Sequence, residues 1–217
     1  MSNRRSFIKK TASVSTLSAA LVTAPYLASC ADQKLIDPIP KSKLSEMNIV
    51  GPKEGYTPHV GTLVSMMNWM RGVMLQPVRG MSVNDLDFLL DDNSNSIGAM
   101  LWHLAGTERF YQINTFDGLH WEGLSAKDDA KWDDASNLGN GGRANIKGYD
   151  LDFYLELLEN VRNFTLEEFK KKDDDWLMIV DENFWRTPTN NYCKWFHVCE
   201  HESNHNGQFK YIKSRIS

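Results

Sequence analysis

Residues 192–213 read YCKWFHVCEHESNHNGQFKYIK, and their apolar positions recur with the spacing of an amphipathic helix. A helix turns about 100° per residue, so residues three and four apart share a face. The residues on one such face are Val198, His201, His205, Gln208, Phe209 and Ile212. His197 lies at the edge of this face. We therefore expect a helix that packs through an apolar face from which two histidines project into the protein.

Three further segments have the spacing of helices. The first begins at Thr57, an N-cap residue followed by proline, and ends by Gly80. The second begins within residues 94–96, where serines provide a cap. The third follows the cap residue Asp150 and ends at a run of three lysines, which suits the negative end of a helix dipole. Together with residues 192–213, these segments predict four helices.

The connections on either side of the third helix are long. Residues 117–149 are polar and rich in glycine, and Ser125 with Asp128 indicates one short helix there. Residues 173–191 are irregular, and β-structure in either connection is left open. Four amphipathic helices need a common core. The sequence therefore predicts an all-α fold, a four-helix bundle with antiparallel or crossover topology and long irregular connections before and after its third helix.

Composition and charge narrow the classes of function. The chain has 217 residues, of which 41% are hydrophobic and 24% charged, as in an ordinary globular protein. All 28 acidic residues, but only 20 of the 24 basic ones, lie after residue 29. This acidic balance argues against a nucleic-acid partner, which needs a basic face. Three cysteines are too few for a disulfide framework, and Cys193 and Cys199 lie too far apart on one helix to bridge.

The first 29 residues resemble a twin-arginine export signal. Arg4 and Arg5 precede an aromatic residue, an aliphatic residue and a lysine, and a weakly apolar stretch follows. Serines and a proline interrupt that stretch, so it does not predict a membrane-spanning helix. Residues 27–29 and Cys30 resemble a lipoprotein box, which implies cleavage before Cys30 and attachment of lipid to it. The alternative is an uncleaved basic tail.

These signals divide the chain into three regions. Residues 1–29 are expected to be the signal peptide, and residues 30–56, which contain three prolines, a flexible tether behind the lipidated Cys30. Residues 57–217 form the folded domain. The mature protein is then extracytoplasmic and anchored to a bacterial membrane through Cys30, at the periplasmic face or the cell surface. A homodimer is left open.

Histidines provide the candidate chemistry. His201 and His205 stand one helical turn apart, the spacing with which helices hold zinc. His197 lies about 12 Å along the axis from His205, too far for the two rings to share an ion. A third ligand must come from another helix, and His103 is the best placed candidate. The alternative is a set of core histidines whose ring nitrogens are satisfied by hydrogen bonds.

Three separated motifs resemble the DinB-like superfamily, metal-dependent four-helix proteins that include thiol S-transferases. Residues 195–208 are similar to the closing helix of that family, and residues 96–108 to its second helix. Trp69 and Arg71 are similar to residues of its first helix. The likeness covers about residues 58–215, nearly the whole predicted domain.

The resemblance implies that His103, His201 and His205 bind one divalent metal ion. Zinc is favoured, and nickel, iron and manganese are left open. Asn204 and Asn206 depart from the family pattern, because another histidine and an arginine are frequent at these two positions. Any role that those two residues have elsewhere in the family is not carried over to this chain.

Three neutral imidazoles leave a divalent ion with its full charge and an open position, which makes it a Lewis acid. The sequence therefore predicts a metal-dependent hydrolase, or a transferase of a thiol or another group, that acts on a small molecule. Export argues against thiol transfer, because low-molecular-weight thiols are mainly intracellular. The alternative function is a non-catalytic metal-binding lipoprotein whose ion is structural or is the cargo.

Glu108 and Gln208 are further candidates for the site. Glu108 follows His103 on the same apolar stripe, where it either orients an imidazole or acts as a base, or pairs with Arg71 or Arg162. Gln208 either hydrogen-bonds within the site or satisfies a polar contact in the core. Three aromatic residues either line a substrate pocket or simply pack: Trp102, Tyr111 and Trp195.

Overall fold

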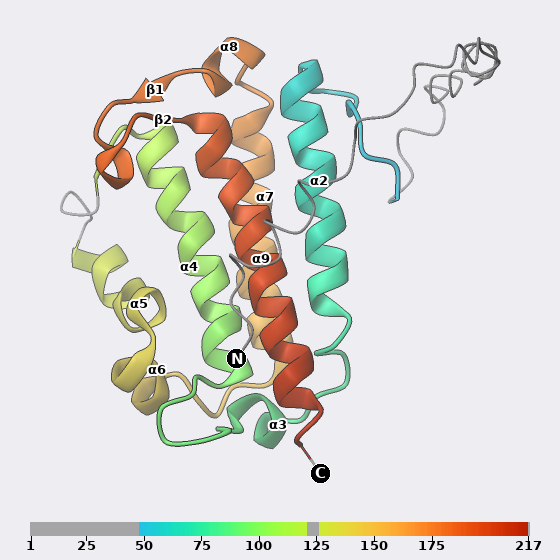
Figure 1. Cartoon of the computed structure of the whole chain (residues 1–217), viewed down its shortest axis with the longest axis vertical. Coiled ribbons are helices and arrows are strands. Elements are labelled where there is room, and N and C mark those ends of the chain that lie inside the picture. Colours follow the sequence, from blue (N-terminus) through green and yellow to red (C-terminus); the bar gives the residue numbers. More distant parts are fainter. Residues whose placement is uncertain (1–47, 121–125, 217) are drawn as a thin grey trace, which may run out of the picture. The chain divides into compact units, whose positions relative to one another are not determined.

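The computed structural model describes residues 48–120 and 126–216 (Figure 1). The expected signal peptide, Cys30 and residues 31–47 lie outside the described residues. Four long helices form the bundle: α2 (Pro58–Leu75), α4 (Ile97–Phe116), α7 (Leu151–Phe169) and α9 (Asn191–Lys213). The predicted all-α architecture is confirmed. None of the helices in the described ranges is long and apolar enough to cross a membrane.

The bundle contains a crossover. Figure 1 shows α2 and α9 running in one direction and α4 and α7 in the other. Because α4 and α7 are parallel neighbours, the chain must return along the length of the bundle between them. The α5 (Ala126–Asn137) and α6 (Gly139–Asn145) helices make that return, and α5 packs against α4 and α6 against α5. Helix α4 therefore contacts α5, α7 and α9, which places it at the centre of the fold.

The crossover corrects one expectation. Residues 117–149 contain two helices where the sequence indicated one short helix. The reason is the narrow apolar face of α5, on which Trp132 and Ala135 are buried against α4. Most other residues of α5 are acidic or polar, so the helix shows little hydrophobic periodicity in the sequence. The pairing of α5 with α4 depends on tertiary contacts.

Short elements close both ends of the bundle. The α3 helix (Val83–Asp87) lies in the connection from α2 to α4, and Ser82 and Asp85 form a capping box at its start. The second long connection, expected to be irregular, contains α8 (Asp174–Leu177), the two-stranded antiparallel hairpin β1 (Val180–Asp181) and β2 (Thr189–Asn190), and the short 3₁₀ helix η3 (Phe184–Arg186) between the strands.

Side-chain caps begin three of the four long helices. Ser96, Asp150 and Asn190 accept hydrogen bonds from backbone N–H groups at the starts of α4, α7 and α9. Helix α2 differs, because Thr57 makes no cap bond of its own. Instead Asp174 of α8 accepts hydrogen bonds from the Thr57 hydroxyl and from the first N–H groups of α2. A residue distant in sequence therefore caps α2 and joins it to α8.

The end of the expected tether is packed against α2. The Gly51 N–H donates to Ser65 Oγ at 3.0 Å. A Cβ added at Gly61 would lie 2.5 Å from the backbone nitrogen of Lys53, so the absence of a side chain there lets the two backbones approach closely. Part of the expected tether, Gly51 and Lys53, therefore packs against α2.

Candidate metal centre

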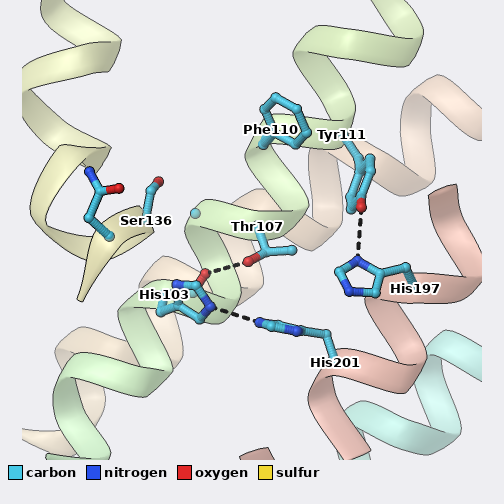
Figure 2. Close-up of a pocket in the computed structure, with 9 residues that line it drawn as sticks. His103, Thr107, Phe110, Tyr111, Ser136, His197 and His201 are labelled. Atoms are coloured by element: carbon cyan, nitrogen blue, oxygen red, sulfur yellow. Dashed lines mark hydrogen bonds between the residues drawn. The ribbon is translucent and has the colours of Figure 1, made fainter. Parts of the chain in front are cut away.

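Three imidazoles from two helices, those of His103, His201 and His205, meet inside the bundle, and Figure 2 shows the first two of them. His103 Nε2 of α4 lies 2.7 Å from His201 Nε2 of α9. His205 Nε2, one turn further along α9, lies 3.3 Å from the same nitrogen. The ring centroids are 4.7–5.3 Å apart. The structure thus brings together the three histidines that the sequence singled out as metal ligands.

The outer nitrogens of two rings are held by hydrogen bonds. His103 Nδ1 lies 2.8 Å from the carbonyl oxygen of Ala135 in α5. His205 Nδ1 lies 2.8 Å from Gln208 Oε1, one turn along α9. An oxygen of this kind only accepts, so each Nδ1 carries the proton and donates it. In a neutral ring the opposite Nε2 then has a bare lone pair, which is the form that binds metal.

Burial keeps these rings neutral. Loss of solvent lowers the pKa of His201 to about 3, and the neighbouring His205, His103 and His197 lower it further. Burial, followed by the charge of His103, lowers the pKa of His205 to about 4, although its bond to Gln208 opposes the shift. Burial also lowers the pKa of His103, against the opposing bonds to α5. All three rings are therefore neutral at pH 7, the form in which an imidazole can bind a metal ion.

This arrangement fits a divalent metal ion. If His201 Nε2 carries a proton, it can donate that proton to only one of its two close neighbours, His103 Nε2 or His205 Nε2. At the other contact, two lone pairs then face each other. A cation between the three nitrogens removes that conflict. Three imidazoles with an open fourth position are a common donor set for catalytic zinc and also suit nickel and iron. The residues present therefore match the metal that the resemblance implied.

A second group of ligand atoms shares one histidine with the first. His197, Glu200 and His201 also bring one ligand atom each within 4.8 Å of one another. His197 Nε2 lies 3.8 Å from Glu200 Oε2, but the Glu200 side chain is 45% exposed. In the group of His103, His201 and His205 one ring is buried and two are half-buried, so this group encloses an ion better. His197 instead bonds through Nδ1 to the Tyr111 hydroxyl at 2.8 Å.

An open cavity reaches two of the three imidazoles. Its volume is about 420 Å³. The residues that line it come from α4, α5 and α9: His103, Gly106, Thr107, Phe110, Tyr111, Ser136, Asn137, His197 and His201. Figure 2 shows the rings of His103 and His201 side by side at this cavity, with Tyr111 and His197 beyond them. A small molecule in the cavity therefore has access to the point where the imidazoles converge.

The expected aromatic residues separate into two groups. Tyr111 lines the cavity. Trp102 packs against Tyr149 and Phe153, and Trp195 against Phe169 and other rings of the core. Trp102 and Trp195 therefore pack against other aromatic side chains and do not line this cavity. Sequence periodicity alone does not distinguish these roles, because core and cavity residues occupy the same helical faces.

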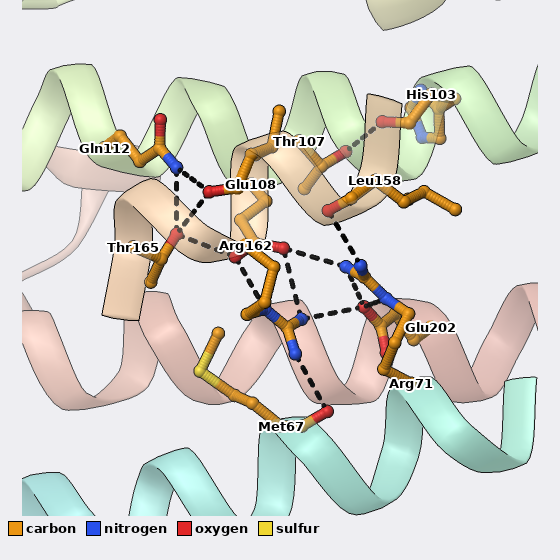
Figure 3. A network of polar contacts seen from close by, with 11 residues as sticks. Met67, Arg71, His103, Thr107, Glu108, Gln112, Leu158, Arg162, Thr165 and Glu202 are labelled. Atoms are coloured by element: carbon orange, nitrogen blue, oxygen red, sulfur yellow. Dashed lines mark hydrogen bonds and ion pairs between the residues drawn. The ribbon is translucent and has the colours of Figure 1, made fainter. Parts of the chain in front are cut away.

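Glu108 lies in a buried ionic network (Figure 3). Its carboxylate accepts hydrogen bonds from Arg162 Nε at 2.8 Å and from Arg71 Nη2 at 2.9 Å. Thr165 Oγ1 donates to the same carboxylate at 2.7 Å. Of the roles expected for Glu108, the structure shows the ion pair, and both Arg71 and Arg162 are its partners. The carboxylate is directed into the core between α4, α7 and α2.

Glu202 completes the network, and the sequence analysis did not identify it. Its Oε1 accepts hydrogen bonds from Arg71 Nε at 2.8 Å and from Arg162 Nη2 at 3.0 Å. A signal was present, because His201, Glu202 and His205 have the HExxH spacing in which zinc proteases use the glutamate as a base. Here Glu202 follows His201 by one residue, about 100° around the helix, and points to the arginines instead.

The network is electrically balanced inside the protein. Burial raises the pKa of Glu108, but the guanidinium groups of Arg162 and Arg71 and the hydrogen bond from Thr165 outweigh it, so the net pKa is lowered. Burial lowers the pKa of Arg162, but the two carboxylates outweigh it and raise the net pKa. Two carboxylates and two guanidinium groups thus join α2, α4, α7 and α9 in the core of the bundle.

Comparisons with known proteins show the family of this chain. A profile of the mycothiol-S-transferase family matches residues 62–217, well over half of the chain. No curated protein sequence matches the chain. The crystal structure of a conserved protein from Enterococcus faecalis is similar in fold, with a TM-score of 0.54 and 13% sequence identity over 70% of this chain and 92% of that one. The chain therefore belongs to the mycothiol-S-transferase family, within the DinB superfamily of metal-dependent proteins.

Proposed function

We propose that this protein joins mycothiol through its sulfur to an electrophilic small molecule, with a divalent metal ion held by His103, His201 and His205. The sulfur–carbon bond forms as the bond from that carbon to its leaving group breaks. The leaving group departs with the bonding electron pair, and the thiol proton passes to solvent. Family membership and the cavity beside the histidines support this reaction.

The chain supplies the geometry for this chemistry. When bound, the metal ion supplies a Lewis acid that lowers the pKa of a thiol. The Ala135 carbonyl and Gln208 fix the rings of His103 and His205 with Nε2 directed to the shared point. The cavity wall on α4, α5 and α9 holds the substrates next to that point. Proximity of the two reactants then contributes to the rate.

The open cavity favours catalysis over the non-catalytic alternative. A structural metal site is normally closed by a fourth protein ligand, whereas a catalytic site keeps one position open. His103 and His201 both line a cavity of about 420 Å³, which leaves space beside the ligand nitrogens for a small molecule. This single observation carries the choice of an enzyme over a protein whose ion is structural or cargo.

The experiment combines mycothiol with 1-chloro-2,4-dinitrobenzene and the purified, zinc-loaded protein. We expect mass spectrometry to detect the thioether product, and its formation to stop after chelation. His201→Ala should lose both zinc and activity, whereas His59→Ala, an exposed histidine on α2, should retain both. If the zinc-loaded protein forms the thioether no faster than the chelated protein, the transferase proposal is wrong. The alternative of a non-catalytic metal-binding protein is then favoured.

We further propose an extracytoplasmic, lipid-anchored location. The twin-arginine motif and the box that ends at Cys30 support it. The thiol substrate would then have to be present outside the cytoplasm. Expression of the full chain with a radiolabelled fatty acid tests the anchor: label should enter the wild-type protein and not Cys30→Ser. Label on both proteins, or on neither, would contradict lipidation at Cys30.

A further inference from the structure

Trp185 holds an unusual position beside the cavity. Its backbone is left-handed, with φ 52° and ψ 24°, and the next residue, Arg186, has φ 64°. Such conformations are strained for residues other than glycine, most of all for bulky ones. The side chain of Trp185 is nevertheless 52% exposed. The hairpin loop between β1 and β2 therefore maintains a strained turn that directs an indole ring toward solvent rather than into the core.

Phe184 anchors this loop to the cavity wall. It is 7% exposed and stacks on Phe110 with ring centroids 6.1 Å apart. On another side it contacts the ammonium group of Lys194, which lies 4.2 Å from the ring centroid. Since Phe110 lines the cavity, the anchor fixes the loop in position relative to the site. The backbone of the adjacent residue then determines where the Trp185 ring lies.

The Trp185 ring continues the aromatic side of the cavity. It packs edge-on against His197, with ring centroids 5.1 Å apart. His197 lines the cavity and in turn contacts Tyr111. Phe110, Tyr111, His197 and Trp185 thus form an aromatic surface that extends from the histidine cluster to the exterior. Among the described residues that line the cavity, there is no acidic residue, lysine or arginine.

We propose that Trp185 determines substrate specificity by binding an uncharged aromatic group of the electrophile. This inference rests on the proposed function and names the class of its second substrate. A flat apolar ring gains from burial against an exposed indole and from offset or edge-to-face contact with it. An ionic group on the electrophile would find no acidic residue, lysine or arginine in the cavity wall to pair with. The strained turn serves this purpose because it places the indole next to His197.

The test measures binding separately from catalysis. The ligand is 1,3-dinitrobenzene, which lacks a leaving group, and its binding to the zinc-loaded protein is followed by calorimetry. We expect Trp185→Ala to raise Kd at least five-fold and Trp185→Phe less than two-fold. Trp69→Ala, an exposed tryptophan on α2 with 38% exposure, is the matched control and should leave Kd unchanged. Zinc content should be the same in all four proteins.

The outcomes separate this inference from the proposed function. With mycothiol and 1-chloro-2,4-dinitrobenzene, Trp185→Ala should raise KM for the electrophile and leave KM for the thiol unchanged. If the wild-type protein is active but Trp185→Ala has unaltered Kd and KM, the inference is wrong and the transferase stands. It is also wrong if dinitrobenzene does not bind, or if Trp185→Phe loses as much affinity as Trp185→Ala. If binding follows the expectation but thioether never forms, the proposed function fails and Trp185 remains a binding residue for aromatic molecules without a role in transfer.

Discussion

His103 donates its Nδ1 proton to the carbonyl oxygen of Ala135, 2.8 Å away, so the crossover helix α5 holds the ring of a candidate metal ligand. Ala135 is fully buried against α4, and its carbonyl therefore has a fixed position. Mutation of a group that orients a metal-binding imidazole typically lowers metal affinity about 10- to 100-fold. The crossover thus contacts the candidate metal centre directly.

Displacing α5 should weaken the metal centre. A Cβ at Gly106 would lie 3.4 Å from Trp132 and 3.6 Å from Ser136, so alanine fits there but leucine does not. We expect Gly106→Leu to lower zinc affinity about 10-fold or more, and Gly106→Ala to leave it nearly unchanged. Competition with a chromogenic chelator measures the affinity. Gly207→Leu is the control, since nothing lies within 4 Å of a Cβ at Gly207. An unaltered affinity in Gly106→Leu would contradict the role of α5.

Gln208 should matter through the ring that it holds. Its Oε1 accepts the Nδ1 proton of His205 at 2.8 Å. Gln208→Ala frees that ring to rotate, so we expect zinc affinity to fall about 10- to 100-fold. Gln208→Glu should retain the affinity because a carboxylate also accepts the proton. Asn204→Ala, an exposed position on the same helix, serves as the control. Equal affinities in Gln208→Ala and Asn204→Ala would refute the orienting role.

The helices and the histidine cluster were predictable because they depend on local patterns. Helical periodicity placed His201 and His205 on the inner face of α9 and made His103 the best placed third ligand, and the resemblance implied the same three residues. The helical rise per residue also predicted that His197 and His205 lie too far apart to bind the same ion. The structure agrees, because the close ring nitrogens of this cluster belong to His103, His201 and His205, and His197 bonds to Tyr111 instead.

Features that depend on tertiary contacts could not be predicted from the sequence. Helix α5 buries Trp132 and Ala135 within an otherwise polar segment, so periodicity did not reveal its length. Asp174 caps α2 from more than 100 residues away, which no local signal encodes. Glu202 lies in an HExxH pattern, yet its direction is set by two arginines on other helices. Each case requires knowledge of which elements are neighbours.

Removing one charge from the buried network should destabilise the bundle. Glu108 is fully buried and accepts hydrogen bonds from Arg71, Arg162 and Thr165. Glu108→Gln leaves a guanidinium charge without its counterion, which costs about 3–5 kcal/mol in comparable buried pairs. Urea denaturation at pH 7 measures the loss. Glu156→Gln, on the outer face of α7, should change the free energy of unfolding by less than about 0.5 kcal/mol. Similar stability of both variants would contradict this role.

The same carboxylate predicts a dependence of stability on pH. The pKa of Glu108 is lowered in the folded protein from its ordinary value of 4.5. The ionised carboxylate therefore contributes its full stabilisation above about pH 4.5, and the contribution is lost as the pH falls toward the lowered pKa. Denaturation curves between pH 6 and pH 3 should show a steeper loss for the wild-type protein than for Glu108→Gln. Parallel curves would show that Glu108 does not carry this dependence.

Relief of the strained turn should stabilise the protein. Arg186 has φ 64°, where a side chain is unfavourable and glycine is not. We expect Arg186→Gly to raise the free energy of unfolding by about 1 kcal/mol, which corresponds to about 2–4 °C in Tm for a chain of this size. Glu182→Gly, in the same loop but outside the left-handed region, should lower Tm because glycine adds entropy to the unfolded chain. If both substitutions lower Tm, the turn at Arg186 stores no strain, and the position of the Trp185 ring must be determined by its contacts with Phe184 and His197 alone.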